Sequence, residues 1–387
     1  MWLKGSPLVL QKDRTRRILL IQLGDIGDLV LSLPCIRALK DNFPEAQVVV
    51  AVRAKAREFI EICPWADDVV SIEQPQLGVM TAVRYYFKFF KRLRAYRFDL
   101  VFDLRAGTRG AILARLSGAP IRVGFYSTKE TFWRNWVFTH LKPFWPDPNR
   151  HQSIYYQSLL TQCGIDVFHR HPEIVMPAEH VNQANRLLAR YGVDLNKQLI
   201  AVHPFALWRY KEWPLQKTAE LVQRLTGCTD RTLLILGAPF ERERAETIVD
   251  QCNGRAVNLA GETTLSVLAA VVKKCALLIG MDSALGHISA AVSTPCVTIF
   301  GPGNPGIWAP LGDHNKIVYK NLPCIHCGQK GCGGQSRSLC LEQLEVEEVL
   351  SAVEKQIDSI QHTDSANPEK TSGRDHSIDD DAGVIYE

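Results

Sequence analysis

Short apolar runs that end in turn residues recur along both halves of the chain, and this repeat constrains the fold more than any other feature. The first half contains Ile18–Leu23, Val48–Val52 and Leu100–Leu104, and the second half contains Leu199–His203, Leu233–Gly237, Leu277–Gly280 and Val297–Gly301. Continuous apolar runs of this length are typical of strands that are buried on both faces. Strands of this kind belong to parallel sheets covered by helices on each side.

Segments with helical periodicity separate these runs, as parallel strands require. They are Leu31–Asn42, Arg84–Tyr96, Val181–Tyr191, Leu215–Leu225, Glu241–Asp250 and Leu265–Lys274. The alternation predicts an α/β fold with two doubly wound parallel sheets, one in each half. A chain of 387 residues has room for two such domains.

The composition predicts five segments. We expect a basic N-terminal arm at residues 1–17, a first domain at 18–175, a second domain at 176–345 and a last helix at 346–361. The junction lies between Gly164 and Asn196, where Pro172 and Pro177 occur. Residues 362–387 form a polar, acidic tail that is expected to be disordered.

The formal net charge of +4 hides an uneven distribution. Residues 1–165 carry 24 basic and 14 acidic side chains, residues 166–361 carry 19 and 20, and the tail carries 2 and 7. The first half is therefore expected to meet an anionic partner. No nucleic-acid-binding motif accompanies the basic half, so we do not expect nucleic acid as the partner.

The chain has no apolar stretch of transmembrane length and lacks the order of a signal peptide, which predicts a cytoplasmic protein. Free thiols in a reducing compartment are consistent with the seven cysteines that occur singly. They are Cys35, Cys63, Cys163, Cys228, Cys252, Cys275 and Cys296.

The first motif that could carry chemistry is Gly24-Asp25-Ile26-Gly27-Asp28, between the first strand and its helix. The carboxyl ends of parallel strands face the ligand crevice. Asp28 could therefore act as a general base on a hydroxyl nucleophile, or it could have only a structural role. Asp25 could simply cap the helix. The G-x-G-x-x-G pattern of dinucleotide-binding proteins is absent, which argues against a dehydrogenase.

Two further motifs follow strands of the second half. Lys211, just before the helix that opens at Leu215, could bind phosphate as a point charge, or it could be solvated. Asp282 and Ser283 precede a helix whose free N–H groups suit a diphosphate, and His287 follows one turn later. A histidine at such a position is commonly structural. With the loop at residues 300–305, these motifs indicate a nucleotide-type ligand.

Taken in order, these segments resemble glycosyltransferase family 9, the heptosyltransferases of the lipopolysaccharide inner core. The resemblance spans about Ile18 to Ser359, on Ile18–Pro34, Leu100–Gly124, Lys211–Pro214, Leu236–Pro239 and Leu259–Pro305. It implies two Rossmann-like domains that face each other across a cleft, the arrangement called GT-B. It also implies inverting, metal-independent transfer, with the nucleotide sugar in the second domain and the acceptor mainly in the first.

The resemblance also assigns residues. Asp28 matches the family's catalytic base, and Arg109 matches an acceptor-binding basic residue. It assigns donor binding to Lys211, Glu241, Thr263, Thr264, Asp282, Ser283 and His287. The sequence departs from the family's pattern at Gln22, Phe205 and Ala284.

These assignments predict transfer of heptose from ADP-heptose to a lipopolysaccharide core or other lipid-linked acceptor, with no cofactor required. Asp28 would remove the acceptor proton while Lys211 and the helix after Asp282 stabilise the leaving diphosphate. Two alternatives remain open. One is a transferase of the same family that uses another nucleotide sugar, such as an N-acetylhexosamine donor. The other is a non-catalytic protein that binds a sugar nucleotide or a metal on this scaffold.

The remaining four cysteines form a cluster, Cys324, Cys327, Cys332 and Cys340, with His326 among them. Four thiolates at this spacing could hold a structural Zn²⁺ ion or an iron–sulfur cluster. Reduced or partly paired thiols are the alternative.

A basic and aromatic stretch, Arg84–Arg97, contains no acidic residue. Its helical periodicity predicts one face packed in the core. The other face could be merely solvated. Alternatively, together with the arm at 12–17, it could bind anionic lipid or a phosphorylated glycolipid at the inner face of the cytoplasmic membrane.

Overall fold

The computed structural model describes residue 8 and residues 10–73, 79–127, 132–143, 150–227, 231–252 and 254–366. Its strands form two sheets in which every pair is parallel, ordered β3-β2-β1-β4-β5-β6 and β12-β11-β10-β7-β8-β9. The first sheet contains β1 (Arg17–Gln22), β2 (Gln47–Arg53), β3 (Asp68–Ile72), β4 (Leu100–Asp103), β5 (Ile121–Phe125) and β6 (His140–Lys142). The second contains β7 (Gln198–His203), β8 (Arg231–Ile235), β9 (Ala256–Asn258), β10 (Leu277–Met281), β11 (Cys296–Ile299) and β12 (Asn315–Val318).

Helices connect the strands in both domains. The first domain has α1 (Ile26–Leu31), α2 (Leu33–Asn42), α3 (Arg57–Glu61), α4 (Val79–Ala95), α5 (Thr108–Ser117), α6 (Phe132–Val137) and α7 (Gln152–Thr161). The second has α8 (Ala178–Arg190), α9 (Leu215–Gly227), α10 (Arg242–Val249), α11 (Leu265–Lys274), α12 (Ala284–Ala291), α13 (Pro305–Trp308), α14 (Leu339–Glu342) and α15 (Val346–Ala366). Short 3₁₀ turns are η1 (Ala54–Ala56), η2 (Arg209–Lys211), η3 (Pro239–Glu241), η4 (Asp250–Cys252) and η5 (Cys332–Gly334).

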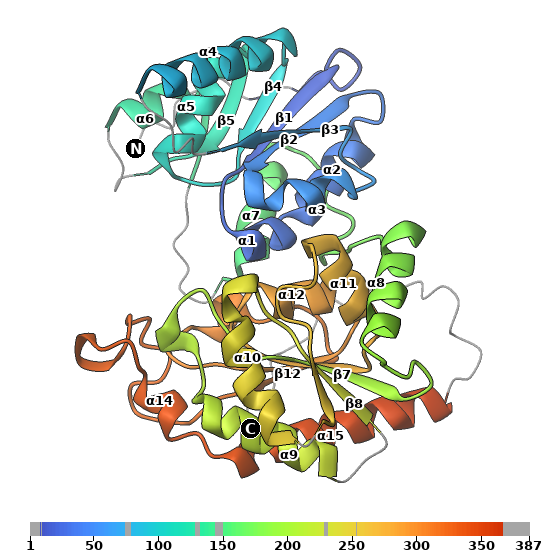
Figure 1. The fold of residues 1–387 in the computed structure, drawn as a ribbon. Helices are drawn as coiled ribbons and strands as arrows, with labels where there is room; N and C mark the ends of the chain where they lie inside the picture. Colours follow the sequence, from blue (N-terminus) through green and yellow to red (C-terminus); the bar gives the residue numbers. More distant parts are fainter. Residues whose placement is uncertain are drawn as a thin grey trace.

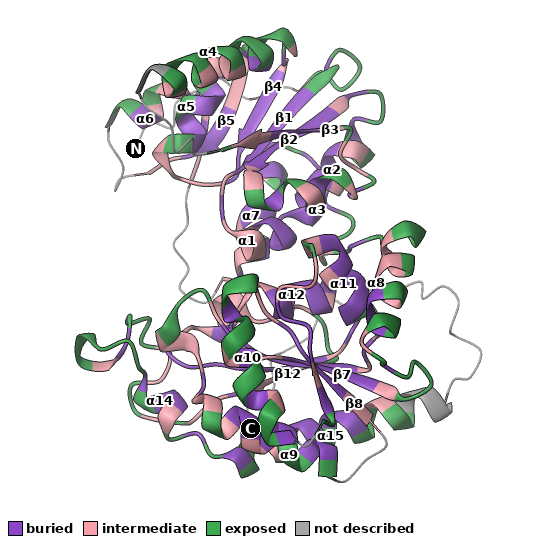
Figure 2. Cartoon of the chain, viewed as in Figure 1, coloured by how far each residue is buried: buried purple, intermediate pink, exposed green. Residues whose placement is uncertain are grey.

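The two domains stack as a series of layers (Figure 1). In the first domain, α4 and α5 pack on the outer face of the sheet, and α1, α2 and α7 pack on the inner face. In the second domain, α8, α11 and α12 cover the inner face of the sheet, whereas α9, α10 and α15 cover its outer face. Buried strands therefore lie between helices whose outward sides are exposed (Figure 2).

The inner layers of the two domains share one apolar core. Residues of α1 and α2, such as Leu29 and Ile36, belong to the same buried cluster as Leu285 and Ile288 of α12. Backbone groups also bond across the junction, since Ile174 N donates to Ala291 O at 2.8 Å. The two domains are thus packed directly against each other, with the carboxyl edges of their sheets on either side of the contact.

The structure confirms the predicted fold class, two parallel-sheet α/β domains. It adds five strands that the apolar runs did not indicate: β3, β5, β6, β9 and β12. These are short, and β3, β6, β9 and β12 lie at or next to the sheet edges, where burial is incomplete and the apolar signal is weak.

The two ends of the chain are described only in part. The last helix, α15, continues to Ala366, so its final turn extends into the segment expected to be disordered, and residues 367–387 lie outside the described part. The basic arm is bonded to its domain, because Lys12 Nζ donates to Asn42 Oδ1 at 2.7 Å and Arg16 N to Asp99 Oδ2 at 2.8 Å. None of the described helices is long and apolar enough to span a membrane.

Candidate functional site

The turn between β1 and α1 places Asp28 at the carboxyl edge of the first sheet. The Asp28 side chain is only 12% exposed, and both of its oxygens are bonded. Tyr156 donates its hydroxyl to Oδ1 at 2.5 Å, while Arg105 Nη1 at 2.7 Å and Asp25 N at 2.9 Å donate to Oδ2. A Cβ at residue 24 would lie 2.4 Å from Asp28 Oδ2, so the turn requires Gly24.

Tyr156 is fully buried beneath this carboxylate. Burial, followed by the charge of Asp28, raises the pKa of Tyr156 well above its ordinary value. The phenol therefore remains protonated and serves as a hydrogen-bond donor to Asp28.

Asp25 has a different environment from Asp28. Its Oδ1 pairs with Lys55 Nζ at 2.6 Å and with Arg53 Nη1 at 2.8 Å. Partial burial acts to raise the pKa of Asp25, but Lys55 and then Arg53 outweigh it and leave the pKa below its ordinary value. Asp25 is thus a half-exposed, charge-paired residue at the rim of the turn.

The loop that carries Arg105 is held by a buried ion pair. Arg134 of α6 and Asp103 at the end of β4 are both almost completely buried, with Nη2 and Oδ2 3.8 Å apart. Arg134 also donates to the carbonyl oxygens of Phe125 at 2.7 Å and Arg105 at 3.1 Å. Burial raises the pKa of Asp103 to about 7 against the opposing effect of Arg134. This pair fixes the backbone from which the Arg105 side chain reaches Asp28.

Arg109, the predicted acceptor-binding residue, lies in the first turn of α5 with its side chain exposed. The structure brings Arg105 to Asp28, and no contact between Asp28 and Arg109 is seen among the described residues. The role of Arg109 remains a prediction.

A second polar cluster lies at the carboxyl edge of the second sheet. Lys211 Nζ contacts Asp282 Oδ2 at 2.6 Å, and the Asp282 side chain is only 7% exposed. A Cβ at residue 303 would lie 2.2 Å from Asp282 Oδ2, so Gly303 lets the 300–305 loop approach this pair. Ser283, the N-cap residue of α12, has its hydroxyl 3.3 Å from His203 Nδ1.

His287 lies in the contact between the domains and is buried. Burial lowers the pKa of His287 to about 3, so its ring is neutral, and among the described residues its Nδ1 has no hydrogen-bond partner. A Cβ at residue 27 would lie 3.2 Å from His287 Cδ2 and 3.6 Å from Ala284 Cα. Gly27 therefore lets the first turn of α1, which carries Asp28, lie against the first turn of α12.

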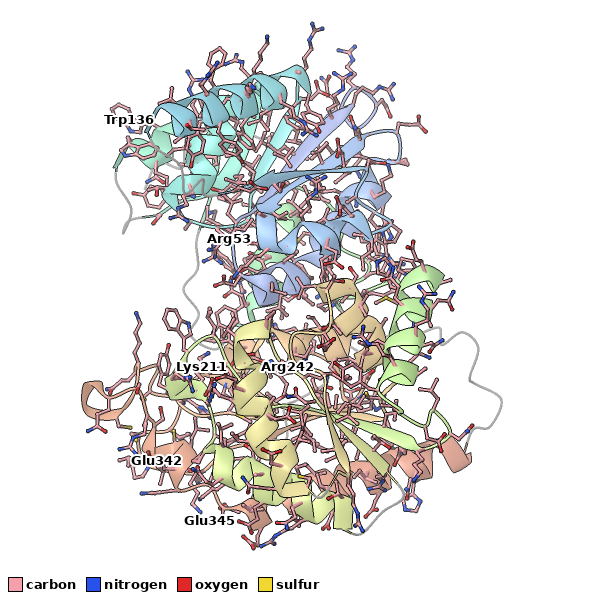
Figure 3. All side chains as sticks on the ribbon, viewed as in Figure 1. Arg53, Trp136, Lys211, Arg242, Glu342 and Glu345 are labelled. Atoms are coloured by element: carbon pink, nitrogen blue, oxygen red, sulfur yellow. The ribbon has the colours of Figure 1, made fainter. Side chains whose placement is uncertain are left out.

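The contact between α1 and α12 brings the turn that carries Asp28 next to the helix that follows Asp282, although Asp28 and Asp282 are about 250 residues apart in sequence. In Figure 3, Arg53 and Lys211 lie on the facing edges of the two domains, on the same side of the molecule. Of the predicted residues, Asp28, Asp282, Ser283 and His287 are at or beside this contact.

Glu241 and Thr264 make other contacts. Glu241 is buried and accepts a hydrogen bond from Ala238 N at 2.7 Å within its own turn, and burial raises its pKa. Thr264 is the N-cap residue of α11 and donates to Glu58 Oε1, 2.5 Å away on α3 of the other domain. The half-buried Thr263 immediately precedes it. Donor-binding roles for these three residues remain predictions.

The cysteine cluster is not arranged as a metal centre. Within the described ranges, no three His, Cys, Asp or Glu side chains are placed to hold a metal ion. Cys324 and Cys327 are exposed on a loop, whereas Cys340 on α14 is directed into the core, where burial raises its pKa to about 11. The Zn²⁺ or iron–sulfur interpretation therefore finds no support in the structure.

The loop that carries these cysteines instead packs against the second cluster. His326 Nδ1 lies 2.8 Å from Gly303 O, and Gly328 N donates to Pro302 O at 2.8 Å. The segment thus supports the 300–305 loop, which lies beside Lys211 and Asp282.

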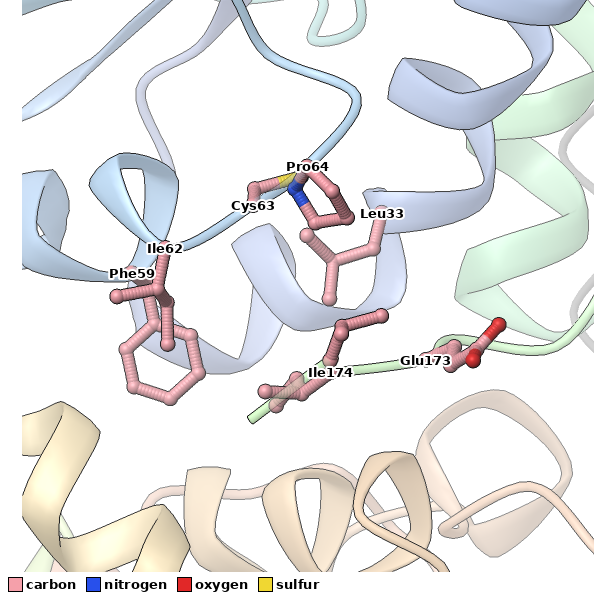
Figure 4. Close-up of a pocket in the computed structure, with 8 residues that line it drawn as sticks. Leu33, Phe59, Ile62, Cys63, Pro64, Glu173 and Ile174 are labelled. Atoms are coloured by element: carbon pink, nitrogen blue, oxygen red, sulfur yellow. The ribbon is translucent and has the colours of Figure 1, made fainter. Parts of the chain in front are cut away.

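A small hollow lies elsewhere, between α2, the end of α3 and the linker at residues 173–175 (Figure 4). Its lining is mostly apolar, with Leu33, Phe59 and Ile174 facing one another. None of the predicted site residues contributes to it.

Sequence reasoning missed the residues that hold Asp28. Arg105 belongs to a segment on which the resemblance depends, but its proximity to Asp28 needs the pairing of β1 with β4. Tyr156 and Arg134 lie outside those segments, and no local pattern marks them. Gln22, which departs from the family's pattern, shapes the turn by accepting a hydrogen bond from Gly24 N at 3.1 Å.

Known proteins resemble this chain over most of its length. Lipopolysaccharide heptosyltransferase 3 of Escherichia coli is 28% identical over 293 residues, which cover 74% of this chain and 84% of that protein. A family 9 glycosyltransferase structure from Veillonella parvula has a TM-score of 0.77 at 22% identity and covers 92% of this chain and 99% of its own. An E. coli heptosyltransferase solved with ADP has a TM-score of 0.69 at 17% identity, with 88% and 99% covered.

The family model for glycosyltransferase family 9 (heptosyltransferase) matches residues 86–336. The matched region includes Lys211, Glu241 and Asp282, while Asp28 precedes it. Because the match spans well over half of the chain, the protein belongs to glycosyltransferase family 9, the heptosyltransferase family, and is a glycosyltransferase.

Proposed function

We propose that this enzyme transfers a heptose from ADP-heptose to a lipopolysaccharide core precursor, with inversion and without a metal cofactor. The observation that carries the proposal is the contact of α1 with α12, in which Gly27, next to Asp28, lies against Ala284 and His287 of the helix that follows Asp282. Relatives named as lipopolysaccharide heptosyltransferases, and a similar structure solved with an ADP-linked fluoroheptose, support the choice of sugar and nucleotide.

In the proposed reaction, an acceptor hydroxyl attacks the anomeric carbon of the heptose. A new C–O bond forms as the bond to the ADP oxygen breaks on the opposite face. The hydroxyl proton passes to Asp28, and ADP leaves with the electron pair of the broken bond. Inversion follows because nucleophile and leaving group occupy opposite faces of the sugar.

The leaving diphosphate would lie at the N-terminus of α12, where backbone N–H groups and the helix dipole favour negative charge. Lys211 supplies a cation there, and the buried Asp282 holds its Nζ in place. These groups provide charge stabilisation to the departing phosphate without a metal ion.

Arg105 would link acceptor binding to the accessibility of the Asp28 carboxylate. Its side chain is 43% exposed and bonds one oxygen of the carboxylate. An anionic group on the acceptor would compete for this guanidinium, and its departure would leave Oδ2 open to the incoming hydroxyl. The excess of basic residues in the first half of the chain is consistent with such an acceptor.

The decisive experiment is Asp28→Asn. We expect kcat for heptose transfer to fall by roughly 10³-fold or more, because a general base contributes about 10²–10⁴. The Kd for ADP, measured by calorimetry, should change less than about twofold, since the carboxylate is not expected to touch the nucleotide. Asp41→Asn, at an exposed position of α2, is the matched control. Asp28→Asn activity near the control value would refute the assignment.

The donor needs its own measurement, because another nucleotide sugar is the alternative within the family. Thermal stabilisation by ADP and ADP-heptose, compared with UDP, GDP and their sugars, should select the adenine nucleotides. We also propose that the acceptor is lipid-linked and that the enzyme works at the inner face of the cytoplasmic membrane. Larger stabilisation by UDP-N-acetylhexosamine would overturn the choice of donor.

A further inference from the structure

The outer helices of the first domain expose an unusual number of large apolar side chains. Phe87 on α4 is 70% exposed and Trp136 on α6 is 71% exposed. Val83, one turn before Phe87, and Ile112 on α5 are also exposed, as is Trp133. Helix α5 packs against both α4 and α6, and these three helices lie in the part of the molecule away from the second domain (Figure 1).

The same three helices contain no acidic residue. Their exposed cations are Arg84, Lys88, Lys91, Arg92, Arg94, Arg109 and Arg115. On α4, Val83, Phe87 and Lys91 are spaced four residues apart and share one face, with Arg84 and Lys88 beside them. Helix α4 thus buries Leu93 in the core and presents a mixed aromatic and cationic side to solvent.

We propose that the exposed side of α4, α5 and α6, here called the outer helical surface, docks onto an anionic lipid bilayer. Tryptophan and phenylalanine favour the boundary between headgroups and acyl chains, and lysine and arginine favour anionic headgroups. A surface that combines both chemistries and has no carboxylate on its helices is complementary to anionic lipid. The proposal rests on the proposed function in one respect: a lipid-linked acceptor would be reached at a membrane surface.

The outer helical surface is joined directly to the Asp28 site. Trp136 is two residues from Arg134, which donates to the carbonyl oxygens of Arg105 and Phe125 from inside the domain. Arg109 lies at the start of α5, just after the loop that carries Arg105. An acceptor anchored in the bilayer would therefore reach the site along the N-terminal end of α5.

Vesicle flotation of the full chain tests the proposal with two compositions, phosphatidylcholine alone and phosphatidylcholine with about one third phosphatidylglycerol. We expect binding to the anionic vesicles, weaker binding to the neutral ones, and a decrease with added salt. Phe87→Ser/Trp136→Ser should weaken partitioning at least about tenfold, because two aromatic anchors are lost. Lys88→Glu/Lys91→Glu should weaken it about tenfold or more through reversed charges.

Matched controls are available on other surfaces of the chain. Phe168→Ser removes an aromatic side chain that is 62% exposed on the segment between α7 and α8, and Lys355→Glu reverses an exposed charge on α15. Both should float as the wild type does. Transfer to a de-acylated, water-soluble acceptor should be unchanged in every variant, and this assay separates failure of docking from failure of the proposed function.

The proposal would be overturned if Phe87→Ser/Trp136→Ser floated with the vesicles as strongly as the Phe168→Ser control. It would also be overturned if the wild-type protein did not bind anionic vesicles at low salt. Light scattering gives a further check. A dimer that Phe87→Ser/Trp136→Ser converts to monomer, without vesicle binding by the wild type, would assign the surface to a second copy of the chain instead.

Discussion

At the scale of single residues, the environment of Asp28 differs from that of a solvent-exposed carboxylate. Three donors hold its two oxygens, and only Arg105 among them is a side chain with substantial exposure. The buried Tyr156 and the Asp25 amide cannot move away without disturbing α7 or the turn. We therefore expect Tyr156 to orient Asp28, and we expect Arg105 to be the donor that leaves Asp28 when the acceptor binds.

Tyr156→Phe tests the orienting role. The ring stays buried, but the hydrogen bond to Oδ1 is lost, and such a bond to a charged group is worth about 1.5–3 kcal/mol. We expect kcat to fall about ten- to a hundredfold while KM for the donor changes little. Tyr85→Phe, which makes the same change on α4 far from Asp28, is the control. A kcat equal to that of the control would show that the Tyr156 hydroxyl does not contribute to the orientation of Asp28 during transfer.

Asp103 gives a prediction about pH. Its folded-state pKa of about 7 lies above the ordinary value of 3.8, so the folded protein holds this proton more tightly than the unfolded chain. Between these values the folded state binds more protons, and stability falls as pH rises. The loss is absent below about pH 4 and complete above about pH 7.

Asp103→Asn removes this titration. Relative to the variant, the wild type should lose about 3 kcal/mol in free energy of unfolding between pH 5 and pH 8, at about 1.4 kcal/mol per pKa unit. Urea unfolding of both proteins at several pH values measures the difference. If the difference in free energy of unfolding between wild type and variant stayed constant from pH 5 to pH 8, the Asp103 carboxyl would titrate at its ordinary pKa.

At the scale of elements, the N-terminus of α11 is capped from the other domain. Glu58 of α3 accepts hydrogen bonds from Thr264 Oγ1, Ser266 N at 3.1 Å and Leu265 N at 3.3 Å. A carboxylate at this end of a helix also interacts favourably with the helix dipole. Since Thr264 is a predicted donor-binding residue, this cap links the position of the first domain to the predicted donor-binding edge of the second.

Glu58→Gln should weaken this cap by about 1 kcal/mol. Hydrogen exchange at the amides of Leu265 and Ser266 should become several-fold faster. Glu61→Gln is a suitable control, because Glu61 lies on the same helix and pairs with Arg57 of its own turn. Equal exchange rates in the two variants would indicate that the domains do not keep this contact in solution.

At the scale of the whole molecule, the contact of α1 with α12 holds the turn that carries Asp28 against the helix that follows Asp282. Gly27 is central to it, because an added Cβ would approach His287 and Ala284 on the facing helix. The separation of Asp28 from the Lys211–Asp282 pair therefore depends on a residue that has no side chain.

Gly27→Ala should push the two helices apart by a few tenths of an ångström or more. We expect kcat/KM for transfer to fall at least about tenfold, because small misplacements between reacting groups are costly. ADP affinity should change little, since the second domain holds the predicted nucleotide site. Gly227→Ala, where nothing lies within 4 Å of an added Cβ, is the control. Unchanged transfer by Gly27→Ala would argue that catalysis does not need this close approach.

The fold could be predicted largely from local pattern. Buried central strands such as β1, β7 and β10 are continuous apolar runs, and α11 has the bounds expected from its periodicity. The edge strands β3 and β12 could not be found this way, because one side of an edge strand is only partly buried and its sequence is mixed. The polar composition after residue 361 does not reveal the final turn of α15, which continues to Ala366.

The sequence by itself determined the central strands, the two parallel sheets and the positions of Asp28, Lys211 and Asp282 in the segments that follow β1, β7 and β10, because periodicity and turn residues act over short distances along the chain. Only the tertiary structure decided which groups meet. Arg105 and Tyr156 reach Asp28 through β4 and α7, and α5 joins the helices that carry Phe87 and Trp136 by packing against both. The contact of Tyr156 with Asp28 joins residues 128 positions apart, and such contacts depend on how buried surfaces pack, which no local pattern records.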